Sequence, residues 1–391
     1  MDHLLSREVT MKPDYSNSIV NLMSSIVSTG GVTSPYSPLD SQSLSGINDA
    51  DNIVLLVIDG LGYNYLKTRG SDTYIARHLK TAITSVFPPS TGSAMTSIYT
   101  GLAPQQHAST GWYVYLKEFG LVSRILPYSN TIDYNVLGES ISHVIDVTSL
   151  PSQMDRDYYV VLNERIIDSE FTRHIVRNAR RIGFDNELDG LFKSVKNTIG
   201  HSDRKKYIQA YWPYLDEVSH IPGPSSQEAQ DHLKFFDAKT KALAESLEGS
   251  STTLIITSDH GFMDVPTANS ILTRDHPELM DSLILPLCGD SRSVFCYVRP
   301  WQTERFETYV QKVFGGICEI YRSKDLINQN WFGLFEVNPK LHSRIGDYTL
   351  IFKDQHAILN CFPGREPPEM LGHHGGVSPD EMLVPLIVID C

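Results

Sequence analysis

Long apolar runs, a leader-like N-terminus and paired cysteines are all missing from this chain of 391 residues. No uninterrupted apolar run approaches the roughly 20 residues that a helix needs to cross a bilayer, so we expect no membrane span. The first residues, Met1 to Glu8, lack the basic region and apolar segment of a secretory signal. The five cysteines form an odd set without Cys-x-x-Cys spacing, at positions 288, 296, 318, 361 and 391. We therefore expect free thiols and a cytoplasmic location.

Positive charge is also scarce, because 33 Lys and Arg residues face 46 Asp and Glu residues and give a formal net charge of −13. A broad basic surface for polymeric nucleic acid or for an anionic membrane is therefore not expected. Bound metal ions could still make one site locally positive. The length suits one large α/β core with an accessory region.

Three apolar runs are each followed directly by an aspartate: Asp59 after 53–58, Asp216 after 207–215 and Asp259 after 254–258. Short runs rich in β-branched and aromatic residues are typical of buried parallel strands. In an open α/β sheet, the loops that leave the carboxyl ends of the strands converge on one crevice. We therefore expect the three carboxylates to meet in space although they are far apart in the sequence.

Histidines accompany two of these aspartates. Asp216 and His220 are four residues apart, so one helical turn or a tight loop would aim both side chains in the same direction. His260 directly follows Asp259. Mixed carboxylate and imidazole ligands suit zinc best among the common metals, with manganese or iron as alternatives, whereas calcium and magnesium favour oxygen ligands. Each motif alone is weak, because an Asp after a strand is often a helix N-cap, but their joint occurrence predicts a metal site.

These segments, in this order, resemble the alkaline phosphatase superfamily and within it the type I phosphodiesterase and nucleotide pyrophosphatase family. The resemblance covers nearly the whole chain, and the matching segments are 57–62, 85–92, 95–102, 216–220, 257–261, 373–378 and 381–385. It implies an α/β fold with an alkaline-phosphatase-like core, in which a mostly parallel central sheet is flanked by helices. It also implies hydrolysis of a small phosphate ester, such as a nucleotide.

The resemblance assigns roles to individual residues. Thr91 matches the nucleophile, since it lies ten residues before Gly101 as the family's catalytic Thr lies before its Thr-Gly, and Ser90 is the runner-up. Two divalent metal ions, zinc or alternatively manganese, are implied. The implied ligands of one ion are Asp59, Thr91, Asp259 and His260, and those of the other are Asp216, His220 and His374. His373 would support the site without binding metal.

The chemistry explains why such residues are needed. A Thr hydroxyl is a poor nucleophile at neutral pH, but coordination to a divalent cation favours the alkoxide. Two ions about 3.5–4 Å apart can stabilise the attacking and leaving oxygens of an in-line displacement. If a helix begins after Thr91, its backbone amides could receive the phosphoryl oxygens. The predicted reaction is hydrolysis of a small phosphodiester or nucleotide pyrophosphate through a phosphothreonine at Thr91.

One segment departs from the family pattern. Nucleotide pyrophosphatases of this family usually place an Asn shortly after the segment found here at 107–109, where it binds a phosphoryl oxygen. This chain has Thr-Gly-Trp-Tyr at 110–113 instead. Side chains that could take its place are those of Trp112, Tyr113, Tyr115 and Lys117, although each is expected to be a packing or surface residue. The substitution leaves the preferred substrate open.

Three alternative functions follow from the sequence. A phosphomonoesterase or phosphonate hydrolase would use the same metals, but a monoester dianion generally needs further positive groups, and no Arg is adjacent to Thr91. A non-catalytic metal-binding regulatory protein is disfavoured by the intact ligand set. The segment 361–365 matches the Cys-x-Pro-x-Arg pattern of sulfatases, but Thr91 already fills the place that this pattern would have to occupy.

Apolar patterning divides the chain into a core and an insertion. Residues 1–269 would form the first part of the catalytic core, with helical cover at 150–202, and residues 347–391 its last part. Between them, 270–346 combines strand and helix patterns, which predicts a small α+β cap. Substrate choice is expected to depend on such a cap, because insertions vary while a metal site is fixed.

Overall fold

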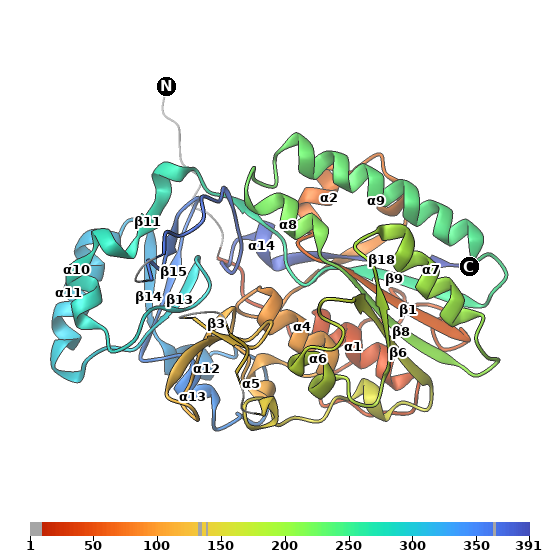
Figure 1. Ribbon diagram of the computed structural model, residues 1–391, viewed down its shortest axis with the longest axis horizontal. Helices are drawn as coiled ribbons and strands as arrows, with labels where there is room; N and C mark the ends of the chain where they lie inside the picture. Colours follow the sequence, from red (N-terminus) through yellow and green to blue (C-terminus); the bar gives the residue numbers. More distant parts are fainter. Residues whose placement is uncertain (1–9, 132–134, 138–139, 363–364) are drawn as a thin grey trace.

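The computed structural model describes residues 10–131, 135–137, 140–362 and 365–391, and the protein has a large and a small lobe (Figure 1). Each lobe is built on a seven-stranded sheet. Among the described helices, none has both the length and the apolar character needed to cross a bilayer.

The central sheet of the large lobe is mostly parallel. Its strands, in spatial order, are β2 (Leu79–Thr84), β18 (Leu383–Asp390), β9 (Thr252–Thr257), β1 (Asn52–Ile58), β8 (Lys206–Trp212), β6 (Asp157–Asn163) and β7 (Arg180–Phe184). Strands β9, β1, β8, β6 and β7 pair in parallel, whereas β18 runs antiparallel to both of its neighbours. The predicted sheet is thereby confirmed.

The side chains that alternate along β1 show how the central sheet packs against helices on both of its faces. Ile53, Leu55 and Val57 belong to one buried apolar cluster, and the residues between them belong to another. The first face carries α1 (Ile19–Ser28), α4 (Thr91–Thr100) and α6 (Glu170–Ile175). The second carries α2 (Tyr63–Arg69), α3 (Tyr74–Arg77), α7 (Leu188–Ile199), α8 (Tyr214–His220) and α9 (Gln227–Ser246). Each fully buried Ile, Leu or Val contributes roughly 1.5–3 kcal/mol relative to its exposed state.

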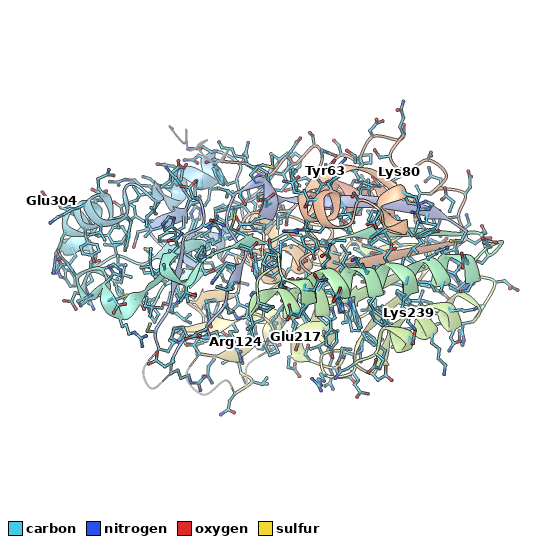
Figure 2. All side chains as sticks on the ribbon, turned by 90° about the horizontal axis from the view of Figure 1, so that it is seen from above. Tyr63, Lys80, Arg124, Glu217, Lys239 and Glu304 are labelled. Carbon is cyan, nitrogen blue, oxygen red and sulfur yellow. The ribbon has the colours of Figure 1, made fainter. Side chains whose placement is uncertain are left out.

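The sheet of the small lobe, here called the cap sheet, is antiparallel. Its strands, in spatial order, are β14 (Cys318–Arg322), β15 (Tyr348–Phe352), β13 (Ser293–Cys296), β12 (Cys288–Gly289), β3 (Tyr113–Leu116), β4 (Leu121–Arg124) and β5 (Ser129–Asn130). Helices α10 (Pro277–Ser282) and α11 (Thr303–Phe314) pack on one face, and α12 (Ser323–Asn328) and α13 (Leu341–Arg344) on the other. Figure 2 places Glu304 of α11 at the far end of this lobe, and Arg124 of β4 and Glu217 of α8 near the junction of the lobes.

Short elements complete the described chain and link the two sheets. They are α5 (Pro104–His107), α14 (Pro379–Met382), β10 (Met263–Asp264), β11 (Ser270–Leu272), β16 (Ala357–Leu359) and β17 (Gly372–His373). The 3-10 helices are Ile141–His143, Pro151–Gln153, Thr267–Asn269, Thr273–Asp275 and Pro300–Gln302. β10 pairs with β17, which brings the chain after β9 beside the segment that precedes His374.

The prediction that residues 150–202 form helical cover is wrong in part. This segment contains α6 and α7, but also β6 and β7 of the central sheet. β6 lies next to β8 and is buried from Tyr158 to Asn163. Its continuous apolar run is that of a strand covered on both faces, and the charged residues around it obscured that pattern.

The cap sheet extends beyond the predicted range 270–346 on both sides. β3, β4 and β5 come from 113–130, and β15 comes from 348–352. Tyr113 of β3 pairs with Gly289 of β12, so strands far apart in sequence close the sheet. A division of the chain at residues 269 and 346 therefore cuts through this sheet.

Candidate metal centre and nucleophile

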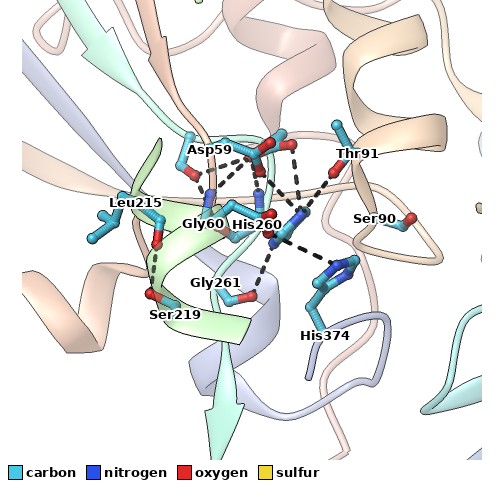
Figure 3. Close-up of polar contacts among 12 residues, drawn as sticks. Asp59, Gly60, Ser90, Thr91, Leu215, Ser219, His260, Gly261 and His374 are labelled. Atoms are coloured by element: carbon cyan, nitrogen blue, oxygen red, sulfur yellow. Dashed lines mark hydrogen bonds and ion pairs between the residues drawn. The ribbon is translucent and has the colours of Figure 1, made fainter. Parts of the chain in front are cut away.

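Asp59, Asp259 and His260 form a buried group, here called the inner cluster. Asp59 directly follows β1, and Asp259 and His260 come just after β9, its parallel neighbour. His260 Nε2 lies 3.3 Å from Asp59 Oδ1 and 3.6 Å from Asp259 Oδ2 (Figure 3). One ligand atom from each residue lies within 4.8 Å of the others. The parallel strands β1 and β9 thus bring these side chains together at their carboxyl ends, as predicted.

Hydrogen bonds fix Asp259 so that one oxygen is left over. Its Oδ1 accepts bonds from the Gly60 amide at 3.2 Å, the His260 amide at 3.0 Å and the Ser258 hydroxyl at 3.2 Å. Its Oδ2 has no hydrogen-bond partner. Gly60 has a φ of +77°, a left-handed conformation that a side chain would strain. The turn after β1 therefore helps to aim Asp259.

The other two members of the inner cluster are oriented in the same way. Tyr211, on β8, donates its hydroxyl to Asp59 Oδ2, and Asp59 Oδ1 has no hydrogen-bond partner. His260 Nδ1 lies 3.0 Å from the Gly261 carbonyl oxygen, which can only accept, so Nδ1 carries the proton. The free Nε2 then faces the carboxylates, which is the arrangement of a histidine metal ligand.

Asp216, His220 and His374 form a second group, here called the outer cluster. Asp216 and His220 lie one turn apart on α8, as predicted, with His220 Nε2 3.3 Å from Asp216 Oδ2. His374 follows β17 and places Nε2 4.0 Å from Asp216 Oδ1. His220 Nδ1 lies 3.0 Å from the Gly372 carbonyl oxygen, so here too Nε2 is the free nitrogen. One ligand atom from each residue again lies within 4.8 Å of the others.

A buried ion pair supports the loop that carries His374. Arg292 Nε donates to Glu381 Oε1 at 2.8 Å, and both side chains are fully buried. The same oxygen accepts a bond from the Gly376 amide at 2.8 Å. Because Arg292 directly precedes β13, the cap sheet is tied to the His374 loop.

The two clusters are adjacent. The rings of His260 and His374 stack with their centroids 3.9 Å apart (Figure 3). The structure thus gathers Asp59, Asp259, His260, Asp216, His220 and His374 in the two groups that the resemblance implied.

Thr91 lies beside the inner cluster and lines a cavity together with the outer cluster. It is the first residue of α4, and its Oγ1 lies 3.2 Å from His260 Nε2 (Figure 3). Its neighbour Ser90 is fully buried, whereas Thr91 lines both cavities described below. The first amides of α4 have no partner within the helix and carry its positive dipole end, which favours an anion beside Thr91.

The electrostatics of the clusters call for cations. Burial, together with the carboxylates of Asp216 and Asp259, raises the pKa of Asp59 well above its ordinary value. Each of these three carboxylates has one buried oxygen without a hydrogen-bond partner. Burial, with His260 and His220 nearby, lowers the pKa of His374, so its imidazole is neutral and can bind metal. Buried charges of one sign are costly unless a counter-charge is present, so the donor set fits two divalent cations.

Two cavities meet at Thr91 and Trp112, which line both. The first, here called the apolar cavity, has a volume of about 300 Å³, and its walls include Met95, Tyr99, Leu126, Leu162, Phe171 and Tyr211. The second, here called the polar cavity, has a volume of about 610 Å³, and its walls include Asp216, His220, Asp290, Asn360, Arg365 and His374. A phosphorus atom at Thr91 would therefore have room for a substituent on either side.

Three residues near the clusters escaped the sequence analysis. Tyr211 was hidden in an apolar strand, where its hydroxyl had no visible partner. Asp290 lies in the turn between β12 and β13, is buried, and accepts a hydrogen bond from the Trp112 amide at 3.3 Å. Burial raises the pKa of Asp290 to about 6. Arg365 could have been found, because it is the Arg of the rejected Cys-x-Pro-x-Arg pattern.

The residues that stand where the family usually has its Asn lie in different surroundings. Trp112 and Tyr113 line the polar cavity, whereas Tyr115 packs on Tyr297 with ring centroids 5.2 Å apart, and Lys117 is exposed. His373 Nδ1 lies 2.9 Å from the Ser291 hydroxyl, and burial lowers its pKa to about 4.

Only part of the segment 361–365, which matches the sulfatase pattern, lies within the described residues. Pro363 and Gly364 lie outside the described residues. Cys361 is half-buried and is not among the residues that line either cavity, and its amide donates to the Thr273 hydroxyl at 2.8 Å. The described part of the segment thus gives Cys361 no place beside Thr91.

Comparisons with known proteins agree with the resemblance seen in the sequence. A family model described as type I phosphodiesterase / nucleotide pyrophosphatase matches residues 53–376. No curated protein sequence matches this chain at a significant level. Murine ectonucleotide pyrophosphatase / phosphodiesterase 5 has a similar structure, with a TM-score of 0.64 and 16% identity over 85% of this chain and 87% of the murine chain. An inactive variant of that protein in complex with AMP gives a TM-score of 0.63 at 16% identity, over 85% and 87% of the two chains.

A bacterial structure is similar to the same extent. Phosphonoacetate hydrolase from Sinorhizobium meliloti 1021, in complex with phosphonoformate, has a TM-score of 0.63 and 16% identity, over 86% of this chain and 89% of the other. At such identities the likeness concerns the fold. It agrees with the alkaline-phosphatase-like core predicted from the sequence.

Proposed function

This chain belongs to the type I phosphodiesterase and nucleotide pyrophosphatase family, and we propose that it hydrolyses small phosphodiesters or nucleotide pyrophosphates through a phosphothreonine at Thr91. Family membership makes it an enzyme that hydrolyses phosphate esters. The observation that carries the proposal of a phosphothreonine at Thr91 is the position of Thr91 Oγ1 beside the two adjacent clusters.

The two clusters would each hold a divalent cation, with zinc as the expected metal and manganese as the alternative. The inner ion would be held by Asp59, Asp259 and His260 together with Thr91, and the outer ion by the outer cluster. When bound, such ions act as Lewis acids that favour the Thr91 alkoxide and offset the charge of the phosphoryl group. The unpartnered carboxylate oxygens are the donors that support this assignment.

The chain's own residues account for the rest of the chemistry. The amides at the start of α4 orient the phosphoryl oxygens, and the cavity walls hold the two substituents. Thr91 Oγ1 forms a bond to phosphorus, and the bond from phosphorus to the departing alcohol or phosphate breaks. Water then attacks the phosphothreonine and releases the phosphorylated product, which restores the Thr91 hydroxyl.

The paired cavities support a diester rather than a monoester. A diester phosphorus carries two organic substituents, and Thr91 has a cavity on either side. The largely apolar walls of one cavity suit a ring system, and a related structure was solved with AMP. A small nucleotide or aryl diester is therefore the expected substrate class.

Phosphonate hydrolysis is a second candidate. The observation that favours it is Arg365, which lines the polar cavity and would attract an anionic substituent, such as a carboxylate. The similar bacterial structure is that of a phosphonoacetate hydrolase. The metal clusters and Thr91 would serve this reaction equally well.

The cytoplasmic location also stays a prediction, since it rests on the cysteines. The five cysteines are free, and three of them are buried. Fractionation of cells that express the protein would test this location directly.

The test is hydrolysis of a substrate panel by zinc-reconstituted protein. The panel contains an aryl phosphodiester, a nucleotide pyrophosphate, an aryl phosphomonoester and phosphonoacetate. The variant Thr91→Ala should lose turnover of every substrate while it keeps its fold and much of its zinc. The variant Thr91→Ser keeps a hydroxyl and should retain measurable turnover, and Ser90→Ala tests the runner-up nucleophile.

Each outcome of this panel has a definite meaning. A preference for diesters that depends on Thr91 supports the proposal, and a preference for phosphonoacetate supports the second candidate. Activity that survives Thr91→Ala but not Ser90→Ala moves the nucleophile to Ser90. Absence of turnover with zinc and with manganese favours a metal-binding regulatory protein.

A further inference from the structure

Asp290 is a buried carboxylate in the polar cavity, outside the two ligand clusters. It lies in the turn between β12 and β13, with 8% of its surface exposed. Its Oδ2 accepts the hydrogen bond from the amide of Trp112, the residue that lines both cavities.

Two close approaches show that Asp290 is built into the site. A Cβ atom on Gly111 would lie 2.6 Å from Asp290 Oδ2, and one on Gly375 would lie 2.5 Å from Asp290 Cβ. Both glycines have positive φ values, +132° and +95°. The loop before Trp112 and the loop after His374 therefore close around the carboxylate from two sides.

The carboxylate of Asp290 shares the polar cavity with Thr91 and the outer cluster. Thr91, Asp216, His220 and His374 line this cavity together with it. Burial keeps the charge of Asp290 from being screened by solvent and salt. The other acid that lines the polar cavity beyond the ligands, Glu366, is exposed and is paired with Arg274. Arg365 is half-buried, so its positive charge is screened more strongly than the negative charge of Asp290.

We propose that Asp290 is a specificity-determining residue that disfavours dianionic phosphomonoesters relative to monoanionic phosphodiesters. This inference rests on the proposed function, because it assumes that the phosphoryl group sits at Thr91. It places a fixed negative charge on the polar-cavity side of the site, in contact with the backbone of Trp112.

The physical reason is the dependence of repulsion on substrate charge. Above its second pKa of about 6, a phosphomonoester carries two negative charges, whereas a diester carries one. A fixed carboxylate repels both, but it repels the dianion about twice as strongly at equal distance. Selectivity of this kind arises from a repulsive element that acts against the wrong substrate rather than from extra contacts to the right one.

The experiment compares 4-nitrophenyl phosphate with phenyl 4-nitrophenyl phosphate at pH 8, where the leaving group is shared and the charges are fixed. The variant Asp290→Asn keeps the shape and an oxygen that accepts the Trp112 amide. It should raise the ratio of monoester to diester kcat/KM by about tenfold or more, since one buried unit charge is removed. Bound zinc per chain, measured in parallel, should not change.

A matched control makes the same acid-to-amide change elsewhere on the cap sheet. Asp354 lies in the turn after β15, is exposed, and has a φ of +46° that Asn tolerates well. Asp354→Asn should leave the ratio within about twofold of the wild-type value. If Asp290→Asn does not fold, Asp290→Ser removes the charge with a smaller side chain, and the same rise in the ratio is expected.

The outcomes separate this inference from the proposed function. A wild-type enzyme that hydrolyses neither ester contradicts the proposed function. A wild-type enzyme that hydrolyses the diester, with a ratio unchanged in Asp290→Asn, overturns the inference alone. Loss of bound metal from Asp290→Asn also overturns it, because Asp290 would then be a metal ligand.

Discussion

The inner and outer clusters have the same kinds of candidate ligand but different surroundings. Side chains of the inner cluster are at most 4% exposed, whereas those of the outer cluster are 10–26% exposed. Inner ligands follow neighbouring strands of the central sheet. Outer ligands lie on the seven-residue helix α8 and on a loop that the cap sheet supports through Arg292 and Glu381. The difference teaches that the core alone organises one site, while the second depends on contact between the lobes.

This contrast predicts different responses to the loss of a ligand. The inner cluster is preorganised by hydrogen bonds that exist without a cation, so its ion should bind tightly and exchange slowly. The outer cluster sits beside the polar cavity, so its ion should exchange faster with solvent. Three substitutions, taken in decreasing order of effect, would break or sharpen this comparison.

Asp259→Ala should have the largest effect. It removes a ligand whose position is fixed by three hydrogen bonds, so the inner ion and activation of Thr91 should be lost together. Turnover should fall by roughly 10³-fold or more, and bound zinc should fall from two to one per chain. Kinetics and elemental analysis would measure both, with the exposed Asp155→Ala as control. Unchanged zinc would show that Asp259 is not a ligand.

His220→Ala should have an intermediate effect that excess metal can reverse. Zinc binding at the outer cluster should weaken by at least roughly 100-fold, since residues that merely orient a ligand already contribute 10–100-fold. Because the remaining ligands face the polar cavity, added zinc should restore much of the turnover. Zinc titration of activity would show the shift, with the exposed His201→Ala as control. A loss that no zinc concentration reverses would contradict an exchangeable outer site.

Tyr211→Phe should have the smallest effect of the three. It removes the hydroxyl that orients Asp59 but leaves every ligand in place. Affinity for the inner ion should fall about tenfold, at the lower end of the range for such partners. Chelator competition would measure this change. Tyr158→Phe, which removes a buried hydroxyl bonded to Gln209 at 2.9 Å, is the matched control and should leave metal affinity unchanged.

The sequence predicted which side chains gather better than it predicted the boundaries of the lobes. The clustering of Asp59, Asp216 and Asp259 was predictable because an apolar run followed by an acid indicates a strand end or the turn just beyond it, and such ends converge. Asp216 lies slightly further on, in the first turn of α8, yet the four-residue spacing to His220 held. The apolar patterns and the order of the segments were enough for this prediction, because each segment carries its own local signal.

Boundaries failed where structure depends on distant pairing. β6 lies among charged residues that suggested surface helices, and only its position beside β8 explains its burial. From the sequence alone we assigned β3 to the core, and only its pairing with β12 shows that it belongs to the cap sheet. Asp290 had no signal at all, because a single acid after Cys-Gly becomes significant only when the Trp112 amide and the polar cavity lie beside it.

The position of β18 has a consequence for the order in which the chain is assembled during synthesis. β18 lies between β2 and β9, so β2, made about three hundred residues earlier, joins the central sheet through β18. His374 also emerges late, shortly before this strand. An unfinished chain on the ribosome therefore carries an open sheet edge and an incomplete outer cluster until translation has passed β18.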